Sequence, residues 1–436
     1  MRSALHLCLF VTLLYGLALS DHHEGHEGHG EHGHEDKHNH SDHHHHDDKG
    51  HDHKHHKSEN MTCHRISDGI SDFSFRLFNQ SLGVGEPRNV FLSPVSIASA
   101  LAMLSVGAKG ATLSQILHGL AFDLTSISLK DIHESFHHLL QMLNKRDSEL
   151  HLSMGNALFI KENLKLLPKF LEDLKSQYDA EAFSTNFQNE EEAKKQINDY
   201  VEKHTNGKIV DLLKSVDKDS ALVLVNYIYL RGTWEMPFDV EDTKEADFHV
   251  DEKTVVKVPM MTRLGMYSTF YDQDLSCTVV NMPYKGNASA LLVIPNEGKM
   301  KRVQDAFTRA KLMEWGDSLG RSWGSAQLYV PRFSITSTLE LKDILQGLGM
   351  TDMFSDHADL SGITGAPDLK ISRALHQAVL SVDEKGTEAA GATAVEAVPM
   401  SIPPEIKADK PFLIVIYDKE TRSTLFMGKI VDPTKK

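Results

Sequence analysis

Residues 384–404 read EKGTEAAGATAVEAVPMSIPP, and this composition is unlike that of a protein core. Small residues dominate, aromatic residues are absent, and no proline occurs before Pro399. Two acidic residues, Glu388 and Glu396, fall on one alternate set of positions, whereas the other set, which begins at Thr387, is small and uncharged. Because successive side chains of a strand point to opposite faces, this segment can enter a sheet with one face buried, or remain an exposed loop. The prolines at its end stop such a strand, since proline cannot donate to the ladder.

The chain on either side of this segment is predicted to be α+β. Apolar residues recur at helical spacing after Ile70, over residues 132–143 and over residues 193–201, and Ser93-Pro94 is typical of a helix start. Apolar runs predict strands at residues 221–230, 277–282, 290–294, 412–417 and 424–431, the first covered on both faces and the last two joined as a hairpin. Helices concentrate early and strands late, which favours large, mostly antiparallel sheets.

The N-terminus has the pattern of a secretory signal peptide. Arg2 precedes an apolar run over residues 5–19, which is short for a membrane span, and Ala18-Leu19-Ser20 supplies small residues for cleavage. We therefore predict a signal peptide over residues 1–20, a secreted, extracellular protein, and no membrane association. The net charge of −15 argues against nucleic-acid binding.

In a secreted protein, cysteines can form disulfides and Asn-X-Ser/Thr sequons can carry glycans. Cleavage after residue 20 leaves Cys63 and Cys277, too few for a disulfide framework, so one bridge, two free thiols and an intermolecular link all stay open. Asn-X-Ser/Thr sequons predict surface glycans, and they occur at Asn39, Asn60, Asn79 and Asn287.

Residues 21–65 are predicted to form a histidine-rich, disordered extension. Residues 21–57 alone hold 16 of the 27 histidines and very few apolar side chains. Neutral imidazoles bind divalent zinc, copper or nickel, so weak metal binding is a hypothesis, centred on His43, His44, His45 and His46. Protonation near a pKa of ~6.5 would reverse the negative charge of the segment, so pH-dependent binding of polyanions such as glycosaminoglycans is a second hypothesis.

One short motif in this extension matches a sequence pattern that is typical of zinc proteases. Residues 34–38 read HEDKH, which fits the pattern H-E-x-x-H. That chemistry requires a stiff helix that places both histidines on one face, and a third ligand in a dry cleft. A polar tract rich in Gly and Asp supplies neither, so we set the metalloprotease reading aside.

The alanine-rich segment described first resembles the reactive-centre loop of serpins, in particular of the extracellular alpha-1-antitrypsin-like group. The similarity covers about residues 73–433 and includes FLSPVSI at 91–97, GNA at 155–157, NY at 226–227, RGTW at 231–234 and ALHQAVL at 374–380. Some segments, such as residues 277–289, are more similar to kallistatin and antichymotrypsin. The resemblance implies a serpin domain over residues 66–436, with a large central, mostly antiparallel sheet, further sheets, about nine helices and an exposed loop at 384–404.

The resemblance also implies which residues act. The bait bond would join Met400 and Ser401, in the context AVPMSIPP. The loop hinge would comprise Glu384, Gly386, Thr387, Glu388, Ala389 and Ala390, and the family's shutter and breach regions would include Ser93, Ser96, Asn226, Trp234 and His376. Taken singly, each of these residues is an ordinary core or surface residue; their order and spacing together carry the interpretation.

By the same resemblance, the protein would be an inhibitor rather than an enzyme, and would act as a suicide substrate of serine proteases. The protease would attack Met400, and the freed segment would insert into the central sheet. Because methionine is flexible and apolar, elastase-like proteases are expected first and chymotrypsin-like ones next. We expect a monomer without a cofactor. Two alternatives remain: a non-inhibitory serpin that carries a small ligand, and a plasma protein that acts through metal or polyanion binding by its histidine-rich extension.

Overall fold

The computed structural model describes residues 61–83, 88–145, 150–386 and 402–435, and these contain ten α-helices, three 3-10 turns and fourteen strands. All of them belong to the unit Ser58–Lys436; the other unit, Met1–Lys57, lies outside the described residues. The helical elements are η1 (Thr62–Ile66), α2 (Ser67–Leu82), α3 (Pro94–Ser105), α4 (Gly110–Gly119), α5 (Leu129–Leu143), α6 (Pro168–Tyr178), α7 (Glu190–His204), η2 (Val240–Asp242), α8 (Met300–Ala306), α9 (Arg309–Leu319), α10 (Lys342–Gly347), η3 (Asp352–Phe354) and α11 (Ser361–Thr364).

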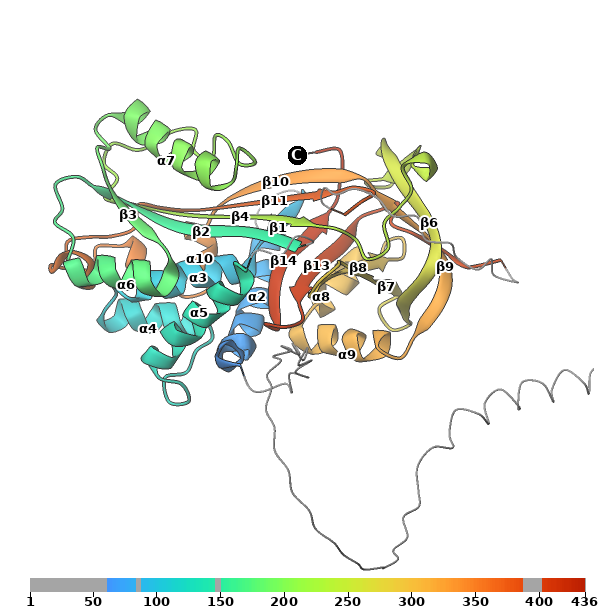
Figure 1. Cartoon of the computed structure of the whole chain (residues 1–436), viewed down its shortest axis with the longest axis horizontal. Helices are drawn as coiled ribbons and strands as arrows, with labels where there is room; N and C mark the ends of the chain where they lie inside the picture. The colour runs from blue at the N-terminus through green and yellow to red at the C-terminus, as the bar shows by residue number, and fades with distance from the viewer. Residues whose placement is uncertain (1–60, 84–87, 146–149, 387–401, 436) are drawn as a thin grey trace, which may run out of the picture. The chain divides into compact units, whose positions relative to one another are not determined.

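Five strands form a long sheet in the order β10-β11-β4-β2-β3 (Figure 1). Their bounds are β2 (Leu150–Lys161), β3 (Glu181–Thr185), β4 (Leu222–Gly232), β10 (Phe333–Glu340) and β11 (Arg373–Val382). The β10–β11 and β2–β4 pairs are antiparallel, whereas the β4–β11 and β2–β3 pairs are parallel. The parallel β4–β11 pair at the centre of the sheet is a departure from the mostly antiparallel arrangement that the sequence predicts.

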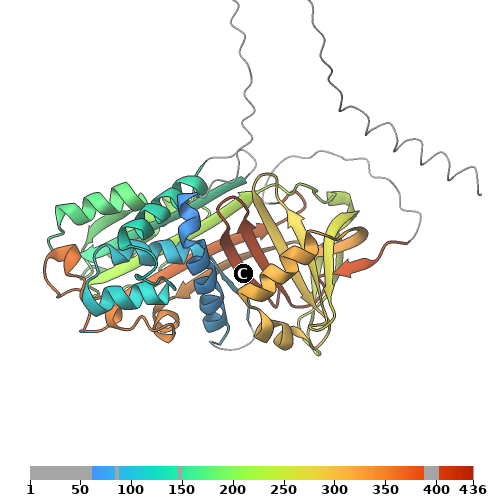
Figure 2. The same ribbon diagram turned by 90° about the horizontal axis from the view of Figure 1, so that it is seen from below.

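The second sheet has nine strands, in the order β1-β14-β13-β8-β7-β6-β9-β12 with β5 paired to β6. Its neighbours are antiparallel except β12 and β9. The strands are β1 (Val90–Leu92), β5 (Lys244–His249), β6 (Val255–Asp272), β7 (Cys277–Pro283), β8 (Ala288–Pro295), β9 (Trp323–Pro331), β12 (Glu405–Lys407), β13 (Phe412–Asp418) and β14 (Ser423–Ile430). Figure 2 shows α8 and α9 beside this sheet, on the side of the molecule away from α4 to α7.

Local sequence explains where the main helices start. Ser93 caps α3 by accepting a hydrogen bond from the Ser96 amide, and Pro94 occupies the first turn. In the same way the Ser128 side chain caps α5. Asn189 caps α7, whose first turn carries three glutamates that favour the positive end of the helix dipole. The helices predicted from periodicity are thus confirmed.

The inner strands β4 and β11 of the five-stranded sheet are buried on both faces, whereas the outer strands β10 and β3 are partly exposed. Helix α3, all of whose residues are buried, packs against β4 and β2 on one face. On the other face α7 contributes Ala193, Ile197 and Val201 to a separate apolar cluster (Figure 1). This double cover explains why β4 is almost continuously apolar, as predicted.

Candidate functional site

The strand β11 ends in a tight turn over residues 383–386, which we call the hinge turn. The Asp383 carboxylate accepts hydrogen bonds from the amides of Lys385 (2.9 Å) and Gly386 (3.1 Å). Gly386 forms antiparallel bridges both with Asp383 and with Thr233, which lies at the end of β4. The turn therefore reverses the chain and directs it toward the line between β11 and β4.

Only glycine fits at the last position of the hinge turn. The φ angle of Gly386 is +121°, and a Cβ there would lie 2.3 Å from the Gly232 carbonyl oxygen. Trp234 closes the turn on one side, because its indole N–H donates to the Asp383 carbonyl at 3.0 Å and its amide donates to Lys385 at 2.9 Å. The Trp234 ring stacks on Tyr284, with 4.1 Å between ring centroids. Gly386 and Trp234 thus fix the conformation of the hinge turn.

Glu384 ties the hinge turn to the body of the protein. Its side chain is only 6% exposed, and its carboxylate accepts from the Thr243 hydroxyl (2.7 Å) and from the Arg332 guanidinium (3.2 Å). Its carbonyl accepts from the Phe238 amide at 2.7 Å. Thr243 and Arg332 were missed by the sequence analysis, because they lie far from Glu384 in the chain and no local pattern marks them.

A buried hydrogen-bond network spans the centre of the five-stranded sheet and the start of α3; we call it the sheet-centre network. The Asn226 side-chain amide donates to Ser96 Oγ (2.7 Å) and to Asn156 Oδ1 (2.6 Å). His376 Nε2 accepts from the Ser93 amide at 3.0 Å, so its Nδ1 carries the proton and donates to Asn226 Oδ1 at 2.5 Å. Of the predicted shutter and breach residues, the network joins Ser93, Ser96, Asn226 and His376, whereas Trp234 lies at the hinge turn. The sequence analysis assigned no role to Asn156 or to Ser99, whose hydroxyl accepts from the Asn156 side-chain amide at 3.1 Å.

The sheet-centre network lies where β4 and β11 pair in parallel. His376 is directly opposite Asn226, within a register that runs from Arg373↔Val223 to Val379↔Tyr229. A strand that followed the hinge turn between these two would run antiparallel to both. Parallel pairing is slightly less stable per residue than antiparallel pairing. The polar groups of the sheet-centre network lie at this parallel β4–β11 pair.

Stability should fall in acid because His376 is buried without charge. Burial lowers the pKa of His376 from 6.5 to about 3, and burial likewise lowers the pKa of His133 to about 4. A depressed pKa in the folded state means that the unfolded chain binds more protons below pH 6.5, so stability present above that pH is lost toward pH 3, by up to ~1.4 kcal/mol per unit for His376. Thermal unfolding between pH 7.5 and 4 measures this loss.

The matched variant is His376→Gln, which keeps a side chain able to donate and accept. We expect it to be less stable than the wild type at pH 7.5, but to lose less stability on acidification. Equal pH slopes for the two proteins would contradict the assignment of His376 as a major acid-sensitive group.

The chain re-enters the described part at Ile402 and is anchored almost at once. The Gln327 amide donates to the Pro404 carbonyl at 2.9 Å, and β12 then pairs in parallel with β9. The predicted bait residues Met400 and Ser401 therefore lie just before a fixed segment, but they themselves, with Thr387, Glu388, Ala389 and Ala390, lie outside the described residues.

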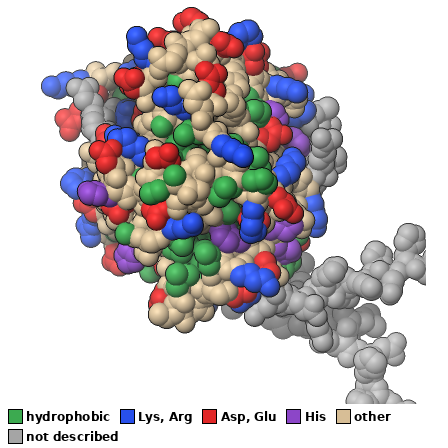
Figure 3. Space-filling view, turned by 90° about the vertical axis from the view of Figure 1, so that its left-hand side faces the viewer, with side chains coloured by type: hydrophobic (Ala, Val, Ile, Leu, Met, Phe, Trp, Pro, Cys, Tyr) green, Lys and Arg blue, Asp and Glu red, His purple; other side chains and the backbone are tan. Residues whose placement is uncertain are grey.

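Only some of the predicted glycosylation and metal-binding residues lie in the part of the chain that the structure describes. Asn79 and Asn287 are exposed, as a glycan requires, whereas Asn39, Asn60 and the cluster His43, His44, His45 and His46 lie outside the described residues. Figure 3 shows histidines on one face among acidic and basic side chains that are mixed rather than segregated. Within residues 61–83, 88–145, 150–386 and 402–435, no group of three or more His, Cys, Asp or Glu side chains is placed to hold a metal ion.

Both cysteines of the described part are free and buried. Burial raises the pKa of the Cys277 thiol to about 12, and burial also raises that of Cys63, so both stay protonated. Cys63 and Cys277 are therefore not bonded to each other, and the burial of both thiols argues against a link to another molecule. Among the helices that the structure describes, none is long and apolar enough to cross a membrane.

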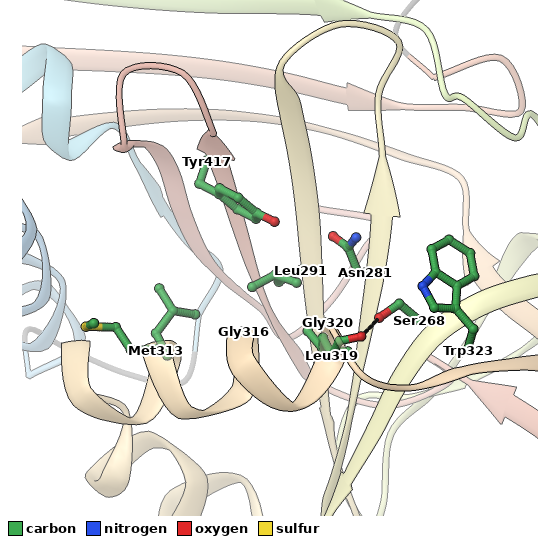
Figure 4. A pocket seen from close by; sticks show the side chains of 10 residues that line it. Ser268, Asn281, Leu291, Met313, Gly316, Leu319, Gly320, Trp323 and Tyr417 are labelled. Carbon is green, nitrogen blue, oxygen red and sulfur yellow. Dashed lines mark hydrogen bonds between the residues drawn. The ribbon is translucent and has the colours of Figure 1, made fainter. Parts of the chain in front are cut away.

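A cavity of about 330 Å³ lies between α9 and the nine-stranded sheet (Figure 4). Its rim carries Met313 and Trp323, whose exposed fractions are 60% and 62%. Inside, Ser268 Oγ donates to the Leu319 carbonyl at 2.5 Å, and Asn281 Oδ1 is buried with no hydrogen-bond partner in the described part of the chain. The remaining lining is mostly apolar: Leu291, Leu312, Gly316, Leu319, Gly320 and Tyr417. This arrangement can accept an apolar molecule that donates one hydrogen bond.

Comparison with known proteins gives consistent matches. A model of the family "Serpin (serine protease inhibitor)" matches residues 68–433. Alpha-1-antiproteinase of Rattus norvegicus is 52% identical over 379 residues, which cover 87% of this chain and 92% of the relative. Alpha-1-antitrypsin of Sus scrofa is 53% identical over 381 residues, which cover 87% and 89%.

Solved structures agree with these matches. Human glycosylated kallistatin superposes with a TM-score of 0.82 at 42% identity, over 86% of this chain and 100% of the other. Human thyroxine-binding globulin complexed with thyroxine gives 0.81 at 42% identity, over 86% and 100%. The family match contains the hinge turn and the sheet-centre network.

Proposed function

Because the chain belongs to the serpin family of serine protease inhibitors, we propose that it is a secreted inhibitor that traps its target as a covalent acyl-enzyme at the Met400–Ser401 bond. The protease serine attacks the Met400 carbonyl, the bond to the Ser401 nitrogen breaks, and the new amine takes its proton from the protease histidine. Residues up to Met400 then insert between β4 and β11 and carry the attached protease with them.

The observation that carries this proposal is the course of the hinge turn. Gly386 already bridges Thr233, the residue after β4, and it exchanges backbone hydrogen bonds with Asp383, the residue after β11. Residues 387–400 continue from this point, and fourteen extended residues span roughly 45 Å. Insertion would replace the parallel β4–β11 contact by two antiparallel ones, which supports a favourable direction for the change.

We propose elastase-like proteases as the first targets and chymotrypsin-like ones as the second. Their specificity pockets accept an unbranched apolar side chain such as that of Met400, whereas the pocket of trypsin-like enzymes presents a carboxylate to Lys or Arg. The exposed sequons Asn79 and Asn287 are proposed glycan sites of the secreted protein.

Denaturing gels test the proposal directly. The protein is mixed with neutrophil elastase and, separately, with trypsin, and a covalent band at nearly the summed mass is expected with elastase first. Elastase with a chemically blocked active serine is the control and should give no such band. Sequencing of the small released fragment should start at Ser401. Cleavage there without a covalent band would mean that the protein is a substrate or a carrier, and not a trapping inhibitor.

The cavity beside α9 favours a second candidate function, carriage of a small apolar ligand. Its support is the buried, unpartnered Asn281 Oδ1 among the described residues, together with the likeness to a globulin that binds thyroxine. Thyroxine is a suitable probe, since it is largely apolar and carries hydrogen-bond donors. Titration should quench the fluorescence of Trp323 at the rim, and Asn281→Leu should weaken the response. A Trp323→Phe protein with the same quenching would show that the signal arises elsewhere.

We also propose metal or polyanion binding for the histidine-rich residues 21–57, separate from protease inhibition. Deletion of these residues should abolish retention on immobilised nickel and acid-dependent binding to heparin, while covalent complex formation persists. Retention by the deleted protein would place metal or polyanion binding in the folded body instead.

A further inference from the structure

Exposed methionines border the cavity beside α9. Met313 on α9 belongs to the lining of this cavity, and its side chain is 60% exposed. Met266 on β6 is 48% exposed, and it lies two residues before Ser268, another lining residue. Because alternate residues of a strand point to the same face, the Met266 side chain lies on the face of β6 that carries Ser268, about 7 Å along the strand. Met266 therefore lies beside the cavity that Met313 lines.

Met266 and Met313 are the most exposed methionines of the described part of the chain. Its other methionines are buried or half-buried; Met282 on β7 and Met427 on β14, for example, lie in the core. Oxidation of methionine to its sulfoxide requires that the oxidant reach the sulfur, so exposed side chains react first. Within the described residues, an oxidant should therefore act first at the two methionines beside this cavity.

Helix α9 is bonded to the sheet on both sides of the cavity, so Met313 has a fixed place in the cavity wall (Figure 4). The indole N–H of Trp315 donates to Asp272 Oδ2 at 2.9 Å, and both side chains are buried. At the end of the helix, the Leu319 carbonyl accepts from the Ser268 hydroxyl. A shift of α9 that widened the mouth of the cavity would break these buried hydrogen bonds. A change in the chemistry of the Met313 side chain is therefore felt by whatever occupies the cavity.

Oxidation by a peroxide would make this part of the wall polar. A sulfur lone pair of the thioether attacks one oxygen of hydrogen peroxide, the O–O bond breaks, and water leaves; sulfur loses two electrons and the peroxide gains them. The product is a sulfoxide, whose S–O group is strongly polar. With a ligand bound, a sulfoxide that faced the cavity would lose its hydration, and one that turned to solvent would leave the ligand without apolar cover. Either arrangement weakens the binding of an apolar ligand.

We propose that Met313, with Met266 beside it, is an oxidation-sensitive gate that lowers the affinity of the cavity for an apolar ligand. This inference rests on the second proposed function, carriage of a small apolar ligand, and it adds the modification that regulates that site. The oxidant is a peroxide, and reduction by a methionine sulfoxide reductase restores the thioether, so the gate is reversible. A bound ligand is therefore released where peroxide is abundant and retained where it is not.

The experiment measures the Kd of thyroxine by calorimetric titration before and after treatment of the full chain with hydrogen peroxide. Mass spectrometry of its fragments gives the sulfoxide content at Met313 and Met266. In the wild type, the Kd should rise about tenfold or more, as expected when binding desolvates one unpaired polar group, and should recover after treatment with the reductase. In Met313→Leu, the same treatment should change the Kd of that variant by less than about twofold.

The matched control is Met300→Leu, at a half-buried methionine on α8 that does not line the cavity. This variant should respond to peroxide as the wild type does. An unchanged Kd in wild-type protein whose Met313 is fully oxidised would overturn the gate and leave the carrier function standing. A response of Met313→Leu equal to that of the wild type would overturn it too, because the sensitive group would then lie elsewhere.

The carrier function itself is tested by the untreated protein. If thyroxine does not bind before oxidation, that function fails and the gate fails with it. Should peroxide lower the melting temperature, the untreated Met313→Gln protein decides the question, since glutamine places a polar group at the same point of the wall without an oxidant. Met313→Gln should bind thyroxine more weakly than the wild type at an unchanged melting temperature. A wild-type Kd in this variant would overturn the inference.

Discussion

Substitution of Met400 by arginine is expected to move inhibition from elastase-like to trypsin-like proteases. A carboxylate at the base of the trypsin-type pocket pairs with a guanidinium, whereas an elastase-type pocket would have to desolvate it. Discrimination by a charged or hydrogen-bonding pocket reaches roughly 10⁴-fold, so the ratio of the two second-order rate constants should change by at least about 10³-fold. Rate constants for the wild type and Met400→Arg with both proteases measure the change.

The matched control places the same substitution at another exposed methionine. Met313→Arg on α9 adds the same charge at a side chain that is 60% exposed and distant in the chain from the bait bond. It should leave the preference for elastase unchanged. If Met400→Arg also keeps the wild-type preference while still forming covalent complexes, the bait bond lies elsewhere, and the new N-terminus of the released fragment locates it.

Much of the fold could be predicted because local patterns and burial agree. The apolar run at residues 221–230 predicts a buried strand, and the polar turn between residues 417 and 424 predicts a hairpin. The structure confirms both, as β4 and as the β13–β14 hairpin. The resemblance to serpins, which rested on the order and spacing of short segments, is confirmed by the family match over residues 68–433.

Other elements carry no clear local signal. Strand β6 runs over Val255–Asp272 with buried and exposed residues in irregular order, because it pairs with three different strands along its length. The sequence gives no indication that β4 and β11 pair in parallel, since this depends on where the chain returns after 140 residues. Ten α-helices occur in the described part, against an expectation of about nine.

The candidate site also contains some residues that could be predicted from the sequence and some that could not. Asn226, His376 and Ser93 were predicted as a group only through the resemblance, and the structure joins them by hydrogen bonds. The partners of Glu384 could not be predicted, because Arg332 and Thr243 reach it only after the two sheets have packed. Long-range contacts of buried charges depend on the complete fold and leave no local pattern.

Substitution of Thr387 by arginine should convert the inhibitor into a substrate. Thr387 is the first residue after Gly386, which already bridges Thr233 directly after β4, and it belongs to the small, uncharged alternate set of the loop. Insertion would place this set against the core, where an unpaired guanidinium costs several kcal/mol. Slower insertion gives water time to release the protease, so the stoichiometry of inhibition should rise about tenfold or more and the covalent band should fade.

The neighbouring residue supplies the control. Glu388 lies on the other alternate set, so Glu388→Arg exposes its new charge to solvent after insertion and should retain nearly normal stoichiometry. Both variants should be cleaved at the same bond, which separates slow insertion from weak binding. Equal trapping by the wild type and Thr387→Arg would mean that the loop does not insert with this face toward the core. Loss of trapping in both variants would show that any cation near the hinge turn is harmful, and that the alternation of side chains is not what decides insertion.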